Sequence, residues 1–434
     1  MSPLRTLFAA LSLSVLAGAA SAQPPARDSL DAIVRDYVAM QLEIGERDEG
    51  YVDAYYGPAE WREAARANPR SVAELAAAAA ALRRRAEAVG AAEGTLEARR
   101  RNFLLAQLTA AATRLRMVQG ERLSFADEAR GLYGVSLEGV LKPLSDYDPV
   151  LAMIEALVPG EGPLADRVEA YASRFTIPRE RLDAVMRAAI AECRRRTAAH
   201  VTLPPGEAFT LEFVTDKPWS GYNWYQGDYR SLIQVNTDLP VRIGRAVDLG
   251  CHEGYPGHHL HNMMLEQALA RGRGWVEYFV YPLYSPQSFI AEGSANYGVD
   301  LAFPGDERLE YETRALYPLA GLPTEGAATY LRLQEAMKAL AGARFTIARD
   351  LLEGRLSRDQ AVDLVQRYQL VSRARAAQSI AFTEQYRAYV INYGLGEDWV
   401  RTYVESMGGE PARRWAAMAE LLSGPTLPSD LVVP

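Results

Sequence analysis

Residues 251–261 read CHEGYPGHHLH, and they hold four of the five histidines in this chain of 434 residues. The four are His252, His258, His259 and His261. Glu253 directly follows the first of them. Imidazole is the commonest protein ligand of zinc, and a carboxylate beside a ligating histidine is the usual general base for water at the metal. The segment therefore indicates a zinc site with Glu253 next to it.

The spacing of these histidines excludes a straight helix through the site. In the common H-E-x-x-H motif two histidines four residues apart share a helix face, but the residue four after His252 is Pro256. On a straight helix His258 would point about 120° away from His252 and lie roughly 9 Å along the axis, and His259 would lie about 10.5 Å away. Two nitrogens on one zinc are about 4 Å apart at most. Because Pro256 and its neighbouring glycines interrupt helices, we predict helix, kink, helix.

Two other interpretations of the segment remain open. In one, it is a loop whose histidines are merely polar. In the other, the histidines perform acid/base chemistry without a metal. A glutamate paired with clustered histidines is uncommon in loops, which favours the metal site.

Residues 252–259 (HEGYPGHH) and 292–297 (EGSANY) resemble the signature pair of the bacterial domain-of-unknown-function 885 family. That family is similar to zinc metallopeptidases of the gluzincin type, in which two histidines and a downstream glutamate bind zinc. The resemblance extends over most of the chain. It implies that His252, His258 and Glu292 bind one Zn²⁺ per chain.

The pattern of apolar residues predicts a mainly α, multi-helix protein with a gluzincin-like fold. A small antiparallel sheet is expected before the metal-binding helix, because the preceding region is rich in strand-forming residues. The expected strands are 209–214, 222–226 and 232–236. Helical spacing recurs on both sides of this region, most clearly over 30–42, 72–89, 95–119, 325–341, 345–353, 357–368 and 373–393.

The first 22 residues have the features of a cleavable signal peptide. Arg5 precedes an apolar run at 7–20, and Ala-Ser-Ala ends at Ala22, after which we expect cleavage. The expected location is therefore the periplasm or the exterior. Residues 23–434 are expected to form one helical unit. The loop 159–163, rich in proline and glycine, could divide it into lobes 28–158 and 164–424.

The net charge and the hydropathy of the chain limit the kinds of partner that it can bind. Cleavage removes Arg5 and no acid, so the net charge goes from −8 to −9, which disfavours nucleic acid and anionic membranes. We expect no membrane span in the mature chain, because the apolar run of the signal is shorter than the roughly 20 residues a span needs. The expected substrate is a short peptide or another small amide. The sequence does not predict an oligomeric state.

Several residues beyond the metal ligands are candidates for the chemistry. Hydrolysis of an amide needs a donor to the oxyanion and a group that holds the substrate. We expect Tyr393 or Tyr389 to be the donor, and Arg387 to bind a substrate carboxylate. Two further candidates for substrate contact are Asn236 and Tyr297. Asn236 lies at the end of a strand that could hold the substrate backbone.

Three more residues are expected close to the metal. Asn296 lies four residues after Glu292, so it shares a helix face with it and can orient a ligating histidine. His259 and His261 could orient a ligand, contact substrate or be structural. Cys193 and Cys251 could form a disulfide, but the preferred interpretation is two buried free thiols.

These features predict an exported zinc-dependent hydrolase. The preferred form is a metallopeptidase that cleaves short peptides with Glu253 as general base. One alternative is a zinc amidase or hydrolase of a non-peptide metabolite. Another is a non-enzymatic periplasmic protein that binds a metal or a ligand, with His259 or His261 closing a four-ligand site.

Overall fold

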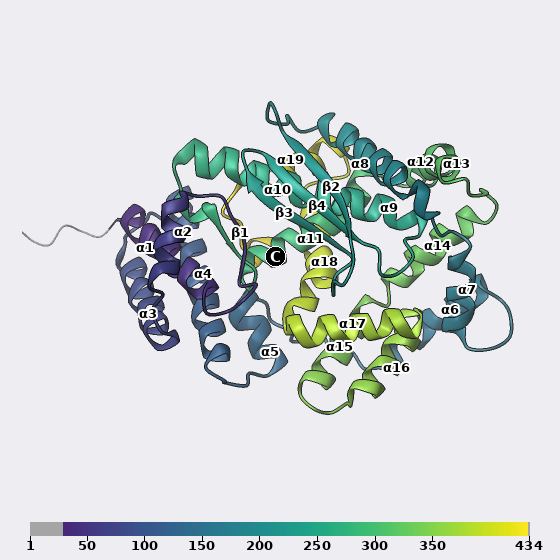
Figure 1. Cartoon of the computed structure of the whole chain (residues 1–434), viewed down its shortest axis with the longest axis horizontal. Helices are drawn as coiled ribbons and strands as arrows, with labels where there is room; N and C mark the ends of the chain where they lie inside the picture. The colour runs from purple at the N-terminus through teal and green to yellow at the C-terminus, as the bar shows by residue number, and fades with distance from the viewer. Residues whose placement is uncertain (1–28, 433–434) are drawn as a thin grey trace, which may run out of the picture.

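The computed structural model describes residues 29–432, so the predicted signal peptide lies outside the described residues. The described chain is mainly helical and contains two small sheets (Figure 1), which confirms the predicted mainly α class. None of the helices between residues 29 and 432 is long and apolar enough to cross a membrane.

Helices build the N-terminal part, at the left of Figure 1. The first helix begins where the Ser29 side chain accepts a hydrogen bond from the backbone N–H of Ala32, and it buries a stripe that includes Ile33 and Tyr37. It packs against α3, which packs against α4. The helices of this part are α1 (Leu30–Gly45), α2 (Ala59–Ala67), α3 (Val72–Ala88), α4 (Leu96–Val118) and α5 (Phe125–Glu128).

The loop 159–163 does not divide the hydrophobic core. It joins α6 (Asp148–Leu157) to α7 (Leu164–Ser173), and Ile154 and Val168 from these two helices belong to one buried cluster. The same cluster includes residues of helices late in the chain, such as Leu333. A lobe boundary at this loop would cut through a packed cluster.

Three strands form the sheet predicted before the metal-binding helix. They are β2 (Ala208–Val214), β3 (Gly221–Gly227) and β4 (Arg230–Asn236), in the order β2-β4-β3. The β3–β4 pair is antiparallel as expected, whereas β2 runs parallel to β4. A second, antiparallel pair joins β1 (Val52–Tyr55) to β5 (Val280–Pro282), which ties the N-terminal helices to the centre of the chain.

The centre of the molecule is α11 (Pro286–Ala302), in which every residue except Asn296 and Asp300 is buried. It packs against α18 (Ile391–Ser406) at unusually close range. A Cβ atom on Gly293 would lie 2.4 Å from the carbonyl oxygen of Gly396, so this contact requires glycine. The close packing places the middle of α11 beside the start of α18.

The remaining helices surround this pair, with α15–α17 along the bottom of Figure 1. Helix α8 packs against α9, and α10 packs against α19. Their bounds are α8 (Leu182–Ala198), α9 (Ile243–Leu249), α10 (His258–Leu265), α12 (Glu307–Tyr311), α13 (Tyr317–Ala320), α14 (Ala327–Lys338), α15 (Ala341–Leu352), α16 (Arg358–Gln369), α17 (Arg373–Tyr386) and α19 (Pro411–Ser423).

Candidate metal centre

Three side chains from three elements converge on one point. His252 lies on the turn η4 (Gly250–Gly254) that continues α9, His258 opens α10, and Glu292 lies in the middle of α11. The two Nε2 atoms are 3.1 Å apart, and Glu292 Oε2 lies 3.2 Å from His252 Nε2 and 3.7 Å from His258 Nε2. Ligands about 2.0–2.2 Å from one zinc are separated by distances of this size. The three donors therefore fit a single zinc ion.

The kink between the histidines is the one predicted from their spacing. The turn η4 ends at Gly254 and α10 begins at His258, with a cis peptide bond between Tyr255 and Pro256. A Cβ atom on Gly257 would lie 1.8 Å from the carbonyl oxygen of His252, so no other residue fits there. This close approach of the backbone folds His258 back toward His252.

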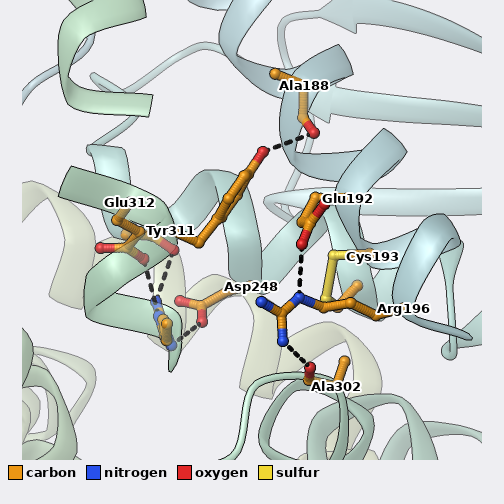
Figure 2. The surroundings of a disulfide bond; sticks show 11 residues. Ala188, Glu192, Cys193, Arg196, Asp248, Ala302, Tyr311 and Glu312 are labelled. Atoms are coloured by element: carbon orange, nitrogen blue, oxygen red, sulfur yellow. Dashed lines mark hydrogen bonds and ion pairs between the residues drawn. A yellow bond between two sulfur atoms is a disulfide. The ribbon is translucent and has the colours of Figure 1, made fainter. Parts of the chain in front are cut away.

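The two cysteines form a disulfide, so the preference for free thiols was wrong. Cys193 on α8 bonds to Cys251, with Cα atoms 5.4 Å apart (Figure 2). Spacing along the chain could not show this pair, because it depends on how α8 packs against η4. Arg196, also on α8, donates to the carbonyl oxygen of Ala302 at the end of α11. Helix α8 thus holds both the His252 turn and α11.

Two further side chains orient His252 and Glu292. The Nδ1 of His252 donates to Asn296 Oδ1 over 2.9 Å, which leaves Nε2 of His252 as an acceptor facing the cluster. Asn296 in turn donates to the carbonyl oxygen of Tyr393 over 3.1 Å. The Tyr389 hydroxyl donates to Glu292 Oε1 over 2.6 Å. Sequence spacing anticipated the position of Asn296 but assigned Tyr389 a different role.

Glu292 and His258 shift each other's pKa values. Burial would raise the pKa of Glu292, but His258 and His252 outweigh it and hold that pKa well below its usual range. Burial would lower the pKa of His258, but Glu292 and other acids raise it to about 9. Glu292 Oε2 is buried without a hydrogen-bond partner. A divalent cation would satisfy this oxygen, since a buried carboxylate needs a partner.

Glu253 lies next to the cluster with its carboxylate unengaged. Its side chain is buried, and Oε2 has no hydrogen-bond partner. Burial raises the pKa of this carboxyl, although His252 and His258 oppose the shift. The Asn223 side chain donates to the Glu253 carbonyl oxygen over 2.7 Å and fixes the backbone. Glu253 thus adds a buried carboxyl without a hydrogen-bond partner beside the three donors, and such a group can act as a general base.

A cavity of about 1030 Å³ opens onto the three donors and Glu253. Its walls include Asp53 on β1, residues 221–223 of β3, and the face of α17 that carries Phe382 and Tyr386. Strand β3 is an edge of its sheet. An extended peptide could add to this edge by β-augmentation.

The aromatic residues near position 390 reach the cavity because the predicted helix 373–393 is broken. Helix α17 ends at Tyr386, and Arg387 has a positive φ of 54° before α18 starts at Ile391. Tyr393 lines the cavity, and its ring centroid lies 6.4 Å from that of His252. Because the Tyr389 hydroxyl is engaged by Glu292, Tyr393 is the better candidate for the donor to the oxyanion.

Arg387 does not reach the cavity, which corrects its predicted role. Its Nε donates to Glu128 Oε1 over 2.8 Å, and the Glu128 side chain is fully buried. The Arg387 guanidinium therefore neutralises the buried carboxylate of Glu128 and does not face a substrate carboxylate. Tyr297 does not line the cavity either, since it is buried with the Arg401 guanidinium over its ring.

Asn236 has a structural role in place of the predicted substrate contact. Its strand β4 is the central one, so both edges of its backbone are paired. The Asn236 side chain donates to the carbonyl oxygens of Lys217 and Trp219, each over 2.8 Å. These bonds hold the loop that leads into β3.

The two remaining histidines of the motif are not part of the cluster. His259 Nδ1 lies 2.7 Å from the hydroxyl of Ser231, and its Nε2 lies 3.3 Å from Glu207 Oε2. His261 is buried, and burial together with the charge of His258 lowers its pKa to about 3. Of the roles that the sequence left open for His259 and His261, a structural role fits both residues.

Two cavity residues were missed by the sequence analysis. Asp53 lines the cavity, and burial raises its pKa to about 7 even though His258 opposes the shift. Arg344 on α15 also lines the cavity, with its guanidinium over the ring of Phe382. Neither position carries a local signal, because an acid in a strand and an arginine on a helix are ordinary surface residues in sequence.

Comparison with solved structures finds one that shares the fold at low sequence identity. One match is "the putative lipoprotein from Colwellia psychrerythraea", at a TM-score of 0.53 and 18% identity, over 82% of this chain and 65% of that one. Another is a "putative lipoprotein of unknown function from Shewanella oneidensis", at a TM-score of 0.47 and 15% identity, over 92% of this chain and 72% of that one. This chain thus spans just under two thirds of the Colwellia protein. No family model and no curated protein matches the chain.

Proposed function

We propose that the protein is an exported zinc-dependent peptidase that cleaves short peptides. The observation that carries this proposal is the convergence of His252, His258 and Glu292 beside the unengaged carboxyl of Glu253, at the wall of a large cavity. Export rests on the expected signal peptide, and it is in keeping with the lipoprotein name of the Colwellia protein. A cavity of about 1030 Å³ has room for a short peptide and favours it over a folded protein.

The residues of the chain divide the chemistry among them. His252, His258 and Glu292 would hold zinc, which supplies Lewis acidity and lowers the pKa of water. Glu253 accepts a proton from the attacking water while the oxygen of that water bonds to the carbonyl carbon of the substrate. Tyr393 donates a hydrogen bond to the carbonyl oxygen as it gains negative charge. The C–N bond then breaks as Glu253 returns the proton to the leaving amine.

The test compares metal content with turnover. Wild type should contain one zinc per chain, and His258→Ala and Glu292→Ala should lose it. Glu253→Gln should retain zinc and lose about 10²–10⁴-fold in peptide hydrolysis, because it removes only the proton acceptor. Normal hydrolysis by Glu253→Gln, or wild type without metal, would refute the mechanism.

A non-enzymatic metal-binding role is less well supported by the geometry. It requires a closed shell of four protein ligands. Between residues 29 and 432, the group of possible ligands at this site contains three residues, and His259 is bonded elsewhere. An amidase acting on a non-peptide metabolite would use the same residues, so a substrate panel must separate it from a peptidase.

A further inference from the structure

Arg344 differs from the other cations that line the cavity. Its Nε is buried without a hydrogen-bond partner, and within residues 29–432 no acid lies at ion-pair distance from its guanidinium. Burial lowers the pKa of Arg344, which is the direction expected when no acid offsets the loss of water. Acids pair with most of the other cavity cations, as in Arg114–Asp48, Arg242–Glu169, Arg245–Asp248, Arg308–Asp248 and Lys338–Asp300.

Arg375 is the other cavity arginine that forms no ion pair within the described residues, although Glu169 lies near enough to act on its charge. Its guanidinium, however, donates to the carbonyl oxygen of Pro240 over 2.6 Å. It also lies near the positive charges of Arg242 and Arg245. Arg375 is thereby a matched control for Arg344, since it lines the same cavity with its guanidinium already engaged.

The packing of α15 places Arg344 beside the proposed catalytic residues. Helix α15 can approach the start of α18 because residue 394 is glycine, where a Cβ atom would lie only 3.0 Å from the Phe345 ring. The Arg344 guanidinium lies 5.3 Å from the centroid of the Phe382 ring, which lies 6.0 Å from that of Tyr393. The Tyr393 ring in turn stacks beside His252. A short aromatic wall thus connects Arg344 to the metal cluster.

We propose that Arg344 binds the free C-terminal carboxylate of the peptide substrate, so that the protein removes residues from carboxyl ends. This inference rests on the proposed peptidase function and names its substrate class. A guanidinium can bind a carboxylate with two parallel hydrogen bonds, and a carboxylate would offset the cost of burying a guanidinium that has no other partner. Phe382 and Tyr386 offer apolar surface to the side chain of the terminal residue. The role predicted for Arg387 thus passes to a residue that faces the cavity.

The test uses pairs of peptides that differ only at the C-terminus, as a free carboxylate or as an amide. Wild type should cleave the carboxylate form with a kcat/KM at least about 30-fold higher, and Arg344→Ala should abolish most of that preference, mainly through KM. Arg344→Lys should restore part of it, and Arg375→Ala should keep it. Equal cleavage of both forms by wild type, or loss of the preference in Arg375→Ala, would overturn the proposal.

Binding separates this proposal from the peptidase mechanism. In Glu253→Gln, calorimetry with the same pairs should show tighter binding of the carboxylate form, and the added change Arg344→Ala should remove the difference. If peptides are cleaved but only their N-acetylation changes affinity, the substrate is held by its amino end, and the Arg344 proposal alone fails. If no peptide is cleaved by wild type that contains zinc, the peptidase function fails and this proposal fails with it.

Discussion

The Tyr389 hydroxyl donates a 2.6 Å hydrogen bond to Glu292 Oε1, while Oε2 of the same carboxylate faces His252 and His258. The two oxygens of one side chain are thus divided between a tyrosine that orients it and the site where a metal would bind. Hydrogen bonds of this kind fix the orientation of metal ligands in proteins. This hydrogen bond distinguishes Tyr389 from Tyr393, the two tyrosines that the sequence left as alternative donors to the oxyanion.

We expect Tyr389→Phe to weaken zinc binding by about 10–100-fold, because Glu292 loses the bond that orients it. Competition with a chelator of known affinity measures the change. Tyr393→Phe is the matched comparison and should leave zinc affinity unchanged while lowering kcat by about 10²-fold. If both variants bound zinc normally, Tyr389 would not position Glu292.

Gly257→Ala should destabilise the protein by about 3 kcal/mol or more, because the new methyl group would overlap the carbonyl oxygen of His252. Gly254→Ala is the control. Its methyl group would lie 3.4 Å from Ile190 Cγ2, an ordinary contact, so a change within about 1 kcal/mol is expected. Chemical denaturation of both variants measures the difference. Equal stability of the two would show that the kink tolerates a side chain.

Loss of the disulfide should destabilise the fold by about 4 kcal/mol, the entropic value for a closed loop of this length, since Cys193 and Cys251 are 58 residues apart. The double change Cys193→Ala and Cys251→Ala should therefore lower the unfolding midpoint. A reductant should lower the midpoint of wild type and leave that of the double variant unchanged. If the reductant lowered the midpoint of wild type and double variant equally, its effect would not come from the Cys193–Cys251 disulfide.

Glu207 should make the free energy of unfolding depend on pH. Burial would raise the pKa of its carboxyl, but hydrogen bonds from His259, Tyr255 and Arg194 lower it to about 2. Because this pKa is depressed in the folded state, the stabilising contribution is complete above about pH 4.5 and is lost as the pH falls toward 2. Urea unfolding of wild type and Glu207→Gln should therefore show a wild-type advantage that shrinks across this window. An advantage that grew as the pH fell would contradict the assignment.

Local sequence was sufficient wherever the geometry depends on one short segment. The helix, kink and helix around His252 and His258 followed from their spacing and from the proline and glycines between them. Asn296 was placed correctly near His252 by its helical spacing from Glu292. The strands at 208–236 were located by composition, although the parallel pairing of β2 with β4 was not predicted.

Relations between distant segments depended on tertiary packing. Glu292 reaches the histidines because α11 is buried against α18 at a contact between two glycines, and its part in the site was expected from a resemblance rather than from spacing. The Cys193–Cys251 bond depends in the same way on the packing of α8. Arg387 was expected at the cavity and Arg344 was not singled out, because a helical pattern shows which residues are polar but not which arginine lines a cavity. Short-range spacing constrains the angles and distances of neighbouring residues, whereas contacts between helices arise only when side chains from both are packed together.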